Sequence, residues 1–128
     1  GGSDPFVVFP TADLEAAASA AAESRMLANG QSCIAAKRFL VHESVYENFR
    51  GRLLEKFAEL RMGAPLESST TLGPLATAQI REDLHSLVED ARKHGGRVLV
   101  GGEVPKTEGY FYPPTVVEGV GKEARLYR

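Results

Sequence analysis

The sequence contains one cysteine and no tryptophan among its 128 residues. A single thiol cannot form a disulfide within the chain, so we expect a protein of a reducing compartment, the cytoplasm. The longest apolar runs fall far short of the ~20 residues that a membrane-spanning helix needs, and the first residues show no basic segment of a signal peptide. We therefore expect no membrane partner.

The sequence also lacks an excess of charge of either sign. Its formal net charge is -2, and both signs are scattered along the chain. No basic surface that would hold a phosphate backbone is predicted, so we expect no nucleic-acid partner. The 43% hydrophobic and 25% charged residues are typical of a folded globular chain with the length of one ordinary domain.

Several chemical motifs are missing as well. The three histidines, His42, His85 and His94, have no C-x-x-C or H-x-x-x-H spacing around them, so no metal site is predicted. We expect His85 and His94 to be solvated. The glycine pairs Gly95–Gly96 and Gly101–Gly102 form neither G-x-G-x-x-G nor a P-loop, which assigns them to turns and leaves no cofactor-binding residue in this chain.

What is present is an alternation of short apolar runs and longer amphipathic segments. The expected strands are 6–9, 38–42, 98–100 and 115–120. The expected helices follow Thr11 as N-cap, follow a capping box of Ser44 and Glu47, and run through Ile80 to His94. This order predicts an α/β fold, a three-layer αβα arrangement with a mostly parallel sheet.

Cys33 lies between a predicted helix stop at Asn29–Gly30 and a predicted strand. Loops at strand ends often carry function in α/β proteins, and an exposed thiol there could act as a nucleophile. Free cysteine is, however, among the most buried residue types. The local sequence alone therefore favours an inert core thiol. The aromatic run Tyr110–Tyr112 is likewise expected to pack a proline-rich loop onto the core, although it could stack a ligand.

Four segments carry a resemblance to a known family. N-G-Q-S-C-I-A-A-K-R-F, from Asn29 to Phe39, resembles the nucleophile segment of the aldehyde dehydrogenases. G-G-S-D-P-F-V-V-F at the start, T-T-L-G-P-L at 70–75 and G-Y-F-Y-P-P-T-V at 109–116 resemble three further motifs of that family. The four occur in the family's order and cover essentially the whole chain.

The resemblance implies a reaction and its residues. Cys33 would be the catalytic thiol, attacking an aldehyde to give a thiohemiacetal that loses hydride to NAD or NADP and leaves a thioester for hydrolysis. The backbone N–H of Cys33 would stabilise the oxyanion. Ser32 and Ile34 would line the pocket for a small-molecule aldehyde, and a homo-oligomer is expected.

The resemblance also implies that the fold is incomplete. Residues 1–128 would form a partial, thiol-bearing catalytic domain, without the family's general-base glutamate or its dinucleotide-binding domain. The wording of the thiol segment is similar to that of bacterial succinate-semialdehyde dehydrogenases. One branch of these has an arginine six residues before the cysteine to hold the substrate carboxylate, and Leu27 stands at that position here.

Two other functions remain open at this point. The chain could be catalytically silent by itself, a structural module completed by other segments or by self-association. It could also use Cys33 alone, as a thiol-dependent esterase or redox module.

Overall fold

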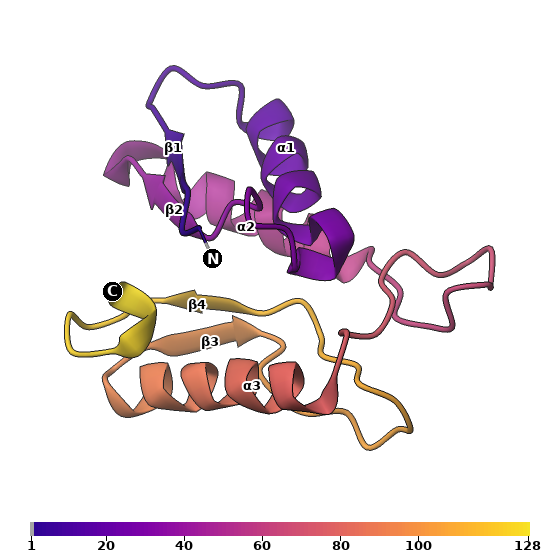
Figure 1. Ribbon diagram of the computed structural model, residues 1–128. Coiled ribbons are helices and arrows are strands. Elements are labelled where there is room, and N and C mark those ends of the chain that lie inside the picture. Colours follow the sequence, from indigo (N-terminus) through magenta and orange to yellow (C-terminus); the bar gives the residue numbers. More distant parts are fainter. Residues whose placement is uncertain (1) are drawn as a thin grey trace. The chain divides into compact units, whose positions relative to one another are not determined.

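The computed structural model describes residues 2–128 and divides the chain into two compact units, Gly1–Leu60 and Arg61–Arg128. Each unit combines α-helix with a two-stranded sheet (Figure 1). No helix in the described residues is long and apolar enough to cross a membrane. The α/β class predicted from the alternation of elements is confirmed.

The sheet of the first unit is a parallel pair, as predicted. β1 (Pro5–Val8) pairs with β2 (Arg38–Val41), with Phe6 opposite Phe39. The centroids of these two rings lie 5.4 Å apart. A parallel pair needs a long crossover between its strands, and α1 (Leu14–Met26) provides it together with the loop that follows.

α1 packs against the second helix of the unit, α2 (Tyr46–Ala58). Small residues of α1 and larger apolar residues of α2 are buried: Ala18, Ala21, Ala22, Phe49, Leu53 and Phe57. Two ion pairs close the edge of this contact, because Glu15 on α1 reaches Arg52 at 2.6 Å and Lys56 at 2.7 Å on α2. Alanine at the buried positions of α1 suits such a close approach of two helices.

The first predicted helix cap is wrong by two residues. Asp13, not Thr11, is the N-cap of α1, and its carboxylate accepts a hydrogen bond of 3.1 Å from the Ala16 N–H. Both residue types serve as N-caps, so local sequence did not separate them.

The predicted capping box of the second helix is also wrong. A 3-10 turn, Glu43–Val45, precedes α2, and the His42 ring accepts the Ser44 N–H at 3.2 Å. Glu47 forms an ion pair with Arg50 on the next turn of the helix. The intervening 3-10 turn moves the helix start past Ser44, which leaves the box without its geometry.

The second unit contains α3 (Ala78–Lys93) and the antiparallel pair β3 (Arg97–Val100) and β4 (Val116–Glu118). The antiparallel pairing differs from the expectation of a mostly parallel sheet. Its reason is the connection, since residues 101–115 form a loop without a helix and return the chain in the opposite direction.

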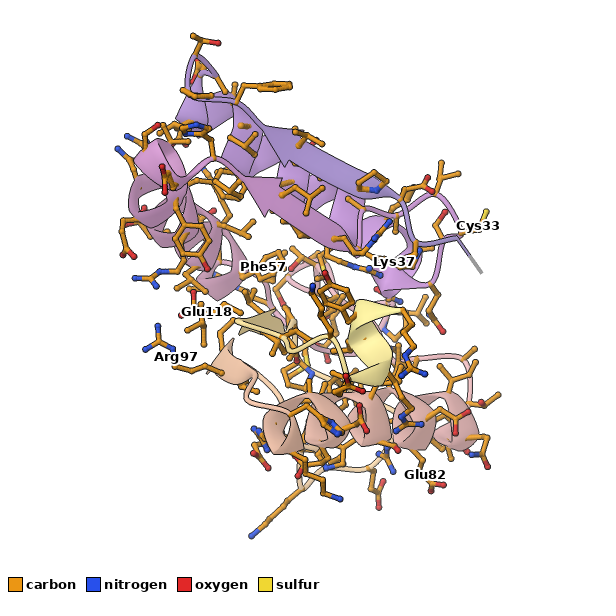
Figure 2. All side chains as sticks on the ribbon, turned by 90° about the vertical axis from the view of Figure 1, so that its left-hand side faces the viewer. Cys33, Lys37, Phe57, Glu82, Arg97 and Glu118 are labelled. Carbon is orange, nitrogen blue, oxygen red and sulfur yellow. The ribbon has the colours of Figure 1, made fainter. Side chains whose placement is uncertain are left out.

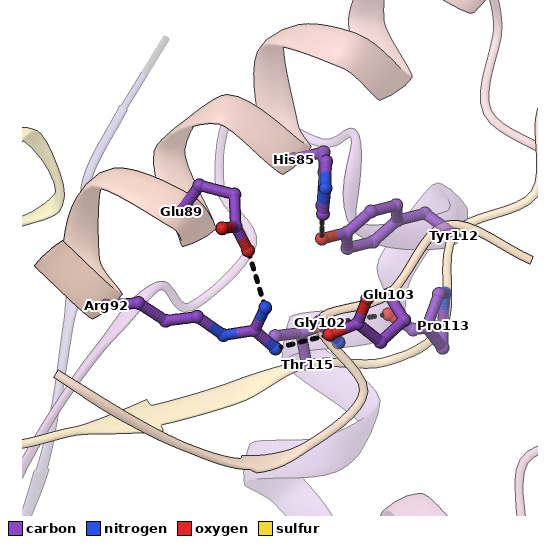
Figure 3. Close-up of polar contacts among 8 residues, drawn as sticks. All are labelled: His85, Glu89, Arg92, Gly102, Glu103, Tyr112, Pro113 and Thr115. Carbon is purple, nitrogen blue, oxygen red and sulfur yellow. Dashed lines mark hydrogen bonds and ion pairs between the residues drawn. The ribbon is translucent and has the colours of Figure 1, made fainter.

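The core of the second unit contains Leu75, Val88 and Tyr112, with Leu84 and Val98 packed against it. Tyr112 is 5% exposed, which confirms that its aromatic loop packs onto the core. Its hydroxyl lies 3.0 Å from Nδ1 of His85, as Figure 3 shows.

A polar layer beside this core ties α3 to the loop that follows β3 (Figure 3). Arg92 pairs with Glu89 at 2.5 Å on its own helix and with Glu103 at 2.8 Å in the loop. The Thr115 hydroxyl accepts the Gly102 N–H at 2.9 Å and donates to the Pro113 carbonyl at 2.9 Å. These contacts hold the long connection between β3 and β4.

Candidate active site in the thiol loop

The segment Leu27–Lys37, called the thiol loop below, connects α1 to β2 and contains Cys33. It begins with a turn at Leu27–Gly30, in which Ala28, Asn29 and Gly30 have φ of 51°, 56° and 78°. Asn29 and Gly30 tolerate this left-handed conformation, as predicted for a helix stop, whereas alanine adopts it at a cost of roughly 1–2 kcal/mol. The abrupt turn ends α1 and starts the loop in a new direction.

The loop is exposed at Cys33 and at the residue after it, and is anchored in the core two residues further on. Ala35 and Ala36 are 0% and 6% exposed, whereas Ile34 is 67% exposed. Cys33 itself is exposed and free, and Figure 2 shows its side chain projecting from the loop. The expectation of a buried thiol, drawn from local sequence alone, is therefore wrong, because the apolar anchoring falls to the alanines that follow.

Arg25, in the last turn of α1, spans the loop from inside. Its guanidinium donates to the carbonyl of Gly30 and, at 3.1 Å, to the carbonyl of Ala36. Burial lowers the pKa of Arg25. The ordinary pKa of arginine is so high that the side chain stays charged. One planar group thus fixes the separation of the two ends of the loop.

Lys37 lies at the C-terminal end of the loop and contacts three of its carbonyl oxygens. The ammonium nitrogen is 3.4 Å from the oxygen of Ser32, 3.4 Å from that of Cys33 and 3.2 Å from that of Ala35. The Ser32 carbonyl also accepts the Ala35 N–H at 3.1 Å, which closes a turn around the thiol. The Lys37 ammonium and the turn from Ser32 to Ala35 therefore hold the same short stretch of backbone.

The segment just before β1 supports the loop from its other side. The Asp4 carbonyl accepts the N–H of Lys37 at 3.2 Å, and the Ser3 carbonyl accepts Nε of Arg38 at 3.2 Å. At Gly2, an added Cβ atom would lie 2.6 Å from the Cys33 carbonyl oxygen. The start of the chain and the thiol loop are thus in close backbone contact, although Gly2 and Cys33 are 31 residues apart in sequence.

The structure brings the three predicted site residues together on this loop. Ser32 is half-buried with its carbonyl held by Lys37, while Cys33 and Ile34 are both exposed. Sequence reasoning missed the two cations that hold the loop. Lys37 lies within the quoted thiol segment and Arg25 four residues before it, but their spacing gave no sign that their partners would be backbone carbonyls.

Two other segments quoted for the family resemblance meet in the second unit. The N–H of Leu75 donates to the carbonyl of Tyr110 at 2.8 Å, and Arg81 donates to the carbonyl of Gly109 at 2.9 Å. The T-T-L-G-P-L and G-Y-F-Y-P-P-T-V stretches are therefore neighbours in space. Leu75 and Tyr112 are both buried there.

The histidines occupy structural positions. His42 caps the turn before α2, and His94 Nδ1 lies 2.8 Å from the Asp90 carbonyl at the end of α3. His85, expected to be solvated, is instead partly buried beside the Tyr112 ring, with centroids 5.9 Å apart. Its neighbour comes from 27 residues further along the chain, which a helical wheel of α3 cannot show.

The described residues show neither a metal centre nor a dinucleotide cradle. No group of three or more His, Cys, Asp or Glu side chains in residues 2–128 could hold a metal ion. Gly95–Gly96 follow α3 and Gly101–Gly102 follow β3 into a loop, so neither pair opens a helix toward a pyrophosphate. Neither glycine pair therefore forms the turn that holds a pyrophosphate in the dinucleotide-binding motif.

The α/β fold and the four motifs quoted above are those of an aldehyde dehydrogenase-like chain. Residues 1–128 match the aldehyde dehydrogenase family over their full length, and the chain belongs to that family.

Curated relatives agree with this assignment. An aldehyde dehydrogenase of Paenarthrobacter nicotinovorans is 52% identical over 128 residues, which are 100% of this chain and 28% of that protein. A succinate-semialdehyde dehydrogenase (NADP+) 1 of Mycobacterium tuberculosis strain H37Rv is 48% identical over 127 residues, 99% of this chain and 28% of that protein. The chain thus spans little more than a quarter of the length of the curated relatives it matches.

Solved structures show the same fold. Succinate-semialdehyde dehydrogenase from Burkholderia pseudomallei matches with a TM-score of 0.94 and 37% identity, over 98% of this chain and 26% of that one. Lactaldehyde dehydrogenase from Escherichia coli matches with a TM-score of 0.94 and 36% identity, over 99% of this chain and 27% of that one.

Proposed function

We propose that residues 1–128 are the thiol-bearing part of the catalytic domain of an NAD(P)-dependent aldehyde dehydrogenase, with the dinucleotide-binding domain outside this chain. The observation that carries the proposal is the exposed Cys33 on a loop whose flanks are fixed by Arg25, Lys37 and two buried alanines. A nucleophile must be both accessible and fixed in place, and an inert core thiol is neither.

In the proposed reaction, Sγ of Cys33 attacks the carbonyl carbon of an aldehyde. The carbonyl oxygen becomes an oxyanion, which the backbone N–H of Cys33 stabilises. Oxidation of this adduct requires a hydride acceptor, and we propose the nicotinamide cofactor NAD or NADP named for several relatives. Loss of hydride converts the adduct to a thioester of Cys33. Water then hydrolyses this thioester, which releases the carboxylic acid and regenerates the thiol, with Ser32 and Ile34 beside the reacting sulfur.

We propose succinate semialdehyde as the first aldehyde to test, because several relatives are named for it. The cations of the loop do not hold its carboxylate in this proposal. Arg25 is engaged with backbone carbonyls, and Leu27, at 49% exposure, presents an apolar side chain before the thiol.

We also propose a cytoplasmic homo-oligomer, for which the exposed apolar residues Val7, Phe9 and Leu40 of the first unit would provide contact area.

The test compares wild type with Cys33→Ala and Cys33→Ser in the complete dehydrogenase that contains this chain. Formation of NAD(P)H from succinate semialdehyde and from other short aldehydes is followed by absorbance. We expect turnover in the wild type and its loss in both variants. Turnover at the wild-type rate in Cys33→Ala would refute the proposal.

The same assay on residues 1–128 alone separates the parent activity from that of the isolated chain. We expect no NAD(P)H there, because the proposal places the dinucleotide-binding domain outside these residues. Aldehyde-dependent NAD(P)H formation by the isolated chain would contradict that expectation.

A further inference from the structure

We propose that Lys37 is a positioning residue that aims the backbone N–H of Cys33 at the oxyanion formed during the reaction. The inference rests on the proposed function of Cys33 and adds a residue to it. Its basis is the set of three carbonyl contacts made by the Lys37 ammonium, which Figure 2 labels on the same loop as Cys33.

The direction of each peptide group follows from these contacts. The chain has no cis peptide bond among its described residues, so each C=O and the N–H of the same peptide unit point in opposite directions. The Ser32 carbonyl faces Lys37, and the N–H of that unit belongs to Cys33. The Cys33 N–H is therefore aimed away from the ammonium. The Cys33 carbonyl faces Lys37 in the same way, which aims the Ile34 N–H away from it too.

The charge acts on the same groups through the peptide bond. A cation at a carbonyl oxygen draws electron density from the amide and makes its N–H a stronger donor. A preorganised donor of this kind stabilises an oxyanion without any reorganisation during the reaction. The contacts of 3.2–3.4 Å are longer than ideal hydrogen bonds, so the orienting effect is shared among three carbonyls.

Lys37 brings the charge to these peptide units, and the Ala35 N–H donates to the Ser32 carbonyl beside it at 3.1 Å. Arg25 binds the carbonyls of Gly30 and Ala36, on either side of the thiol, whereas Lys37 binds those of Ser32 and Cys33 themselves. A neutral side chain at 37 would remove the charge from these two peptide units and keep both the outer anchors and the turn closed by the Ala35 N–H. The expected defect is therefore a misaligned N–H on a loop that remains folded.

Two reactions of the same thiol separate aiming from mere folding. With p-nitrophenyl acetate, Sγ attacks the acyl carbon through an oxyanion, p-nitrophenolate leaves and a thioester forms. With iodoacetamide, Sγ displaces iodide from a saturated carbon and no oxyanion forms. Only the first reaction uses an N–H directed at oxygen.

The experiment measures both rates, and aldehyde turnover, in the complete enzyme for wild type, Lys37→Met, Lys37→Gln and Lys37→Arg. Lys106→Met, an exposed lysine of the second unit, is the matched control. We expect Lys37→Met to slow acylation and kcat by about tenfold to a hundredfold, with alkylation within about twofold of wild type. Lys37→Arg, which keeps the cation, should recover most of the loss, and Lys106→Met should change neither rate.

Unchanged acylation in Lys37→Met overturns the inference, and so does an equal loss of acylation and alkylation, which indicates a structural role. If Lys37→Met does not fold, Lys37→Gln decides by the same ratio of rates. Wild-type enzyme that is not acylated also overturns it. Acylation needs no cofactor, so a Lys37 effect on the ester without any NAD(P)H formation from aldehydes would sink the dehydrogenase proposal and leave this inference standing.

Discussion

The carbonyl oxygen of Cys33 lies 2.6 Å from the position that a Cβ atom on Gly2 would occupy. Real Cβ atoms do not approach a backbone oxygen so closely, so Gly2→Ala must displace either the thiol loop or the segment before β1. A displacement of about 1 Å at a nucleophile can cost a hundredfold in rate. We expect Gly2→Ala to lower kcat for aldehyde oxidation by at least about tenfold, measured by NAD(P)H absorbance.

Gly51→Ala is the matched control and a prediction in its own right. Gly51 lies within α2, is exposed, and would place its Cβ in open space. Alanine favours a helix over glycine by about 0.5–1 kcal/mol. We expect Gly51→Ala to raise the free energy of unfolding by that amount in urea titrations and to leave kcat unchanged. An equal loss of activity in both glycine variants would show that the contact at Cys33 is unimportant.

The bridge made by Arg25 can be tested through stability. Its guanidinium is half-buried and satisfies the carbonyls of Gly30 and Ala36, which Arg25→Met would leave without that donor. Losing charged hydrogen bonds of this kind costs about 2–3 kcal/mol. We expect that loss in chemical denaturation. Arg25→Lys should recover only part of it, because one ammonium cannot reproduce a planar fork, and full recovery would argue against the bridging geometry.

The elements that sequence predicted well are those specified by local pattern. The helix stop at Asn29–Gly30 and the packing of Tyr112 follow from residue types within a few positions, and the parallel strand pair follows from the alternation of strand and helix patterns. The predicted cap at Thr11 was wrong because Asp13, two residues on, serves equally well, and the capping box at Ser44 was wrong because a 3-10 turn moves the start of α2 past it. The antiparallel pairing of β3 and β4 depends on the direction in which the connecting loop returns the chain. The residue pattern within the strands does not predict that direction.

The candidate site divides in the same way. Ser32, Cys33 and Ile34 could be singled out by their resemblance to a family segment, whereas composition placed the thiol in the core. The hydrogen bonds from Arg25 and Lys37 to backbone carbonyls could not be foreseen. A basic residue at the end of a helix or just before a strand usually has a solvated side chain. Contacts between side chains and carbonyls depend on the loop path, and that path includes Ala28 in a conformation alanine seldom adopts.

Glu15 provides a test through pH. Hydrogen bonds from Lys56 first, and from Arg52, lower its pKa in the folded chain. Its contribution to stability is therefore present above the pKa of the unfolded chain and is lost as the pH falls through the lowered folded value. We expect Glu15→Gln to reduce the free energy of unfolding at pH 7 and to match wild type at strongly acidic pH.

The control for Glu15 is Glu23→Gln, an exposed carboxylate on the same helix. Urea denaturation across acidic to neutral pH measures the difference for each variant. A Glu15→Gln deficit that persists unchanged at strongly acidic pH, or one that Glu23→Gln shares, would show that the ion pairs with α2 are not its source.

Tyr112 allows the second unit to be probed by titration. Burial raises the pKa of its phenol from 10.0 to about 12, and its hydroxyl lies 3.0 Å from His85 Nδ1. Its neutral form is favoured by the fold, so its contribution is fully present below the unfolded value and is lost as the pH rises through about 12. We expect a late tyrosinate absorbance step at 295 nm near that pH.

Tyr112→Phe should remove this late step. It should also lower the free energy of unfolding at pH 7 by about 1 kcal/mol, the usual worth of one hydrogen bond. Because phenylalanine does not ionise, the stability of the variant should fall less steeply than that of wild type as the pH rises above 10. A late step that survives in Tyr112→Phe would assign the raised pKa to another tyrosine and remove the evidence that this phenol is buried against α3.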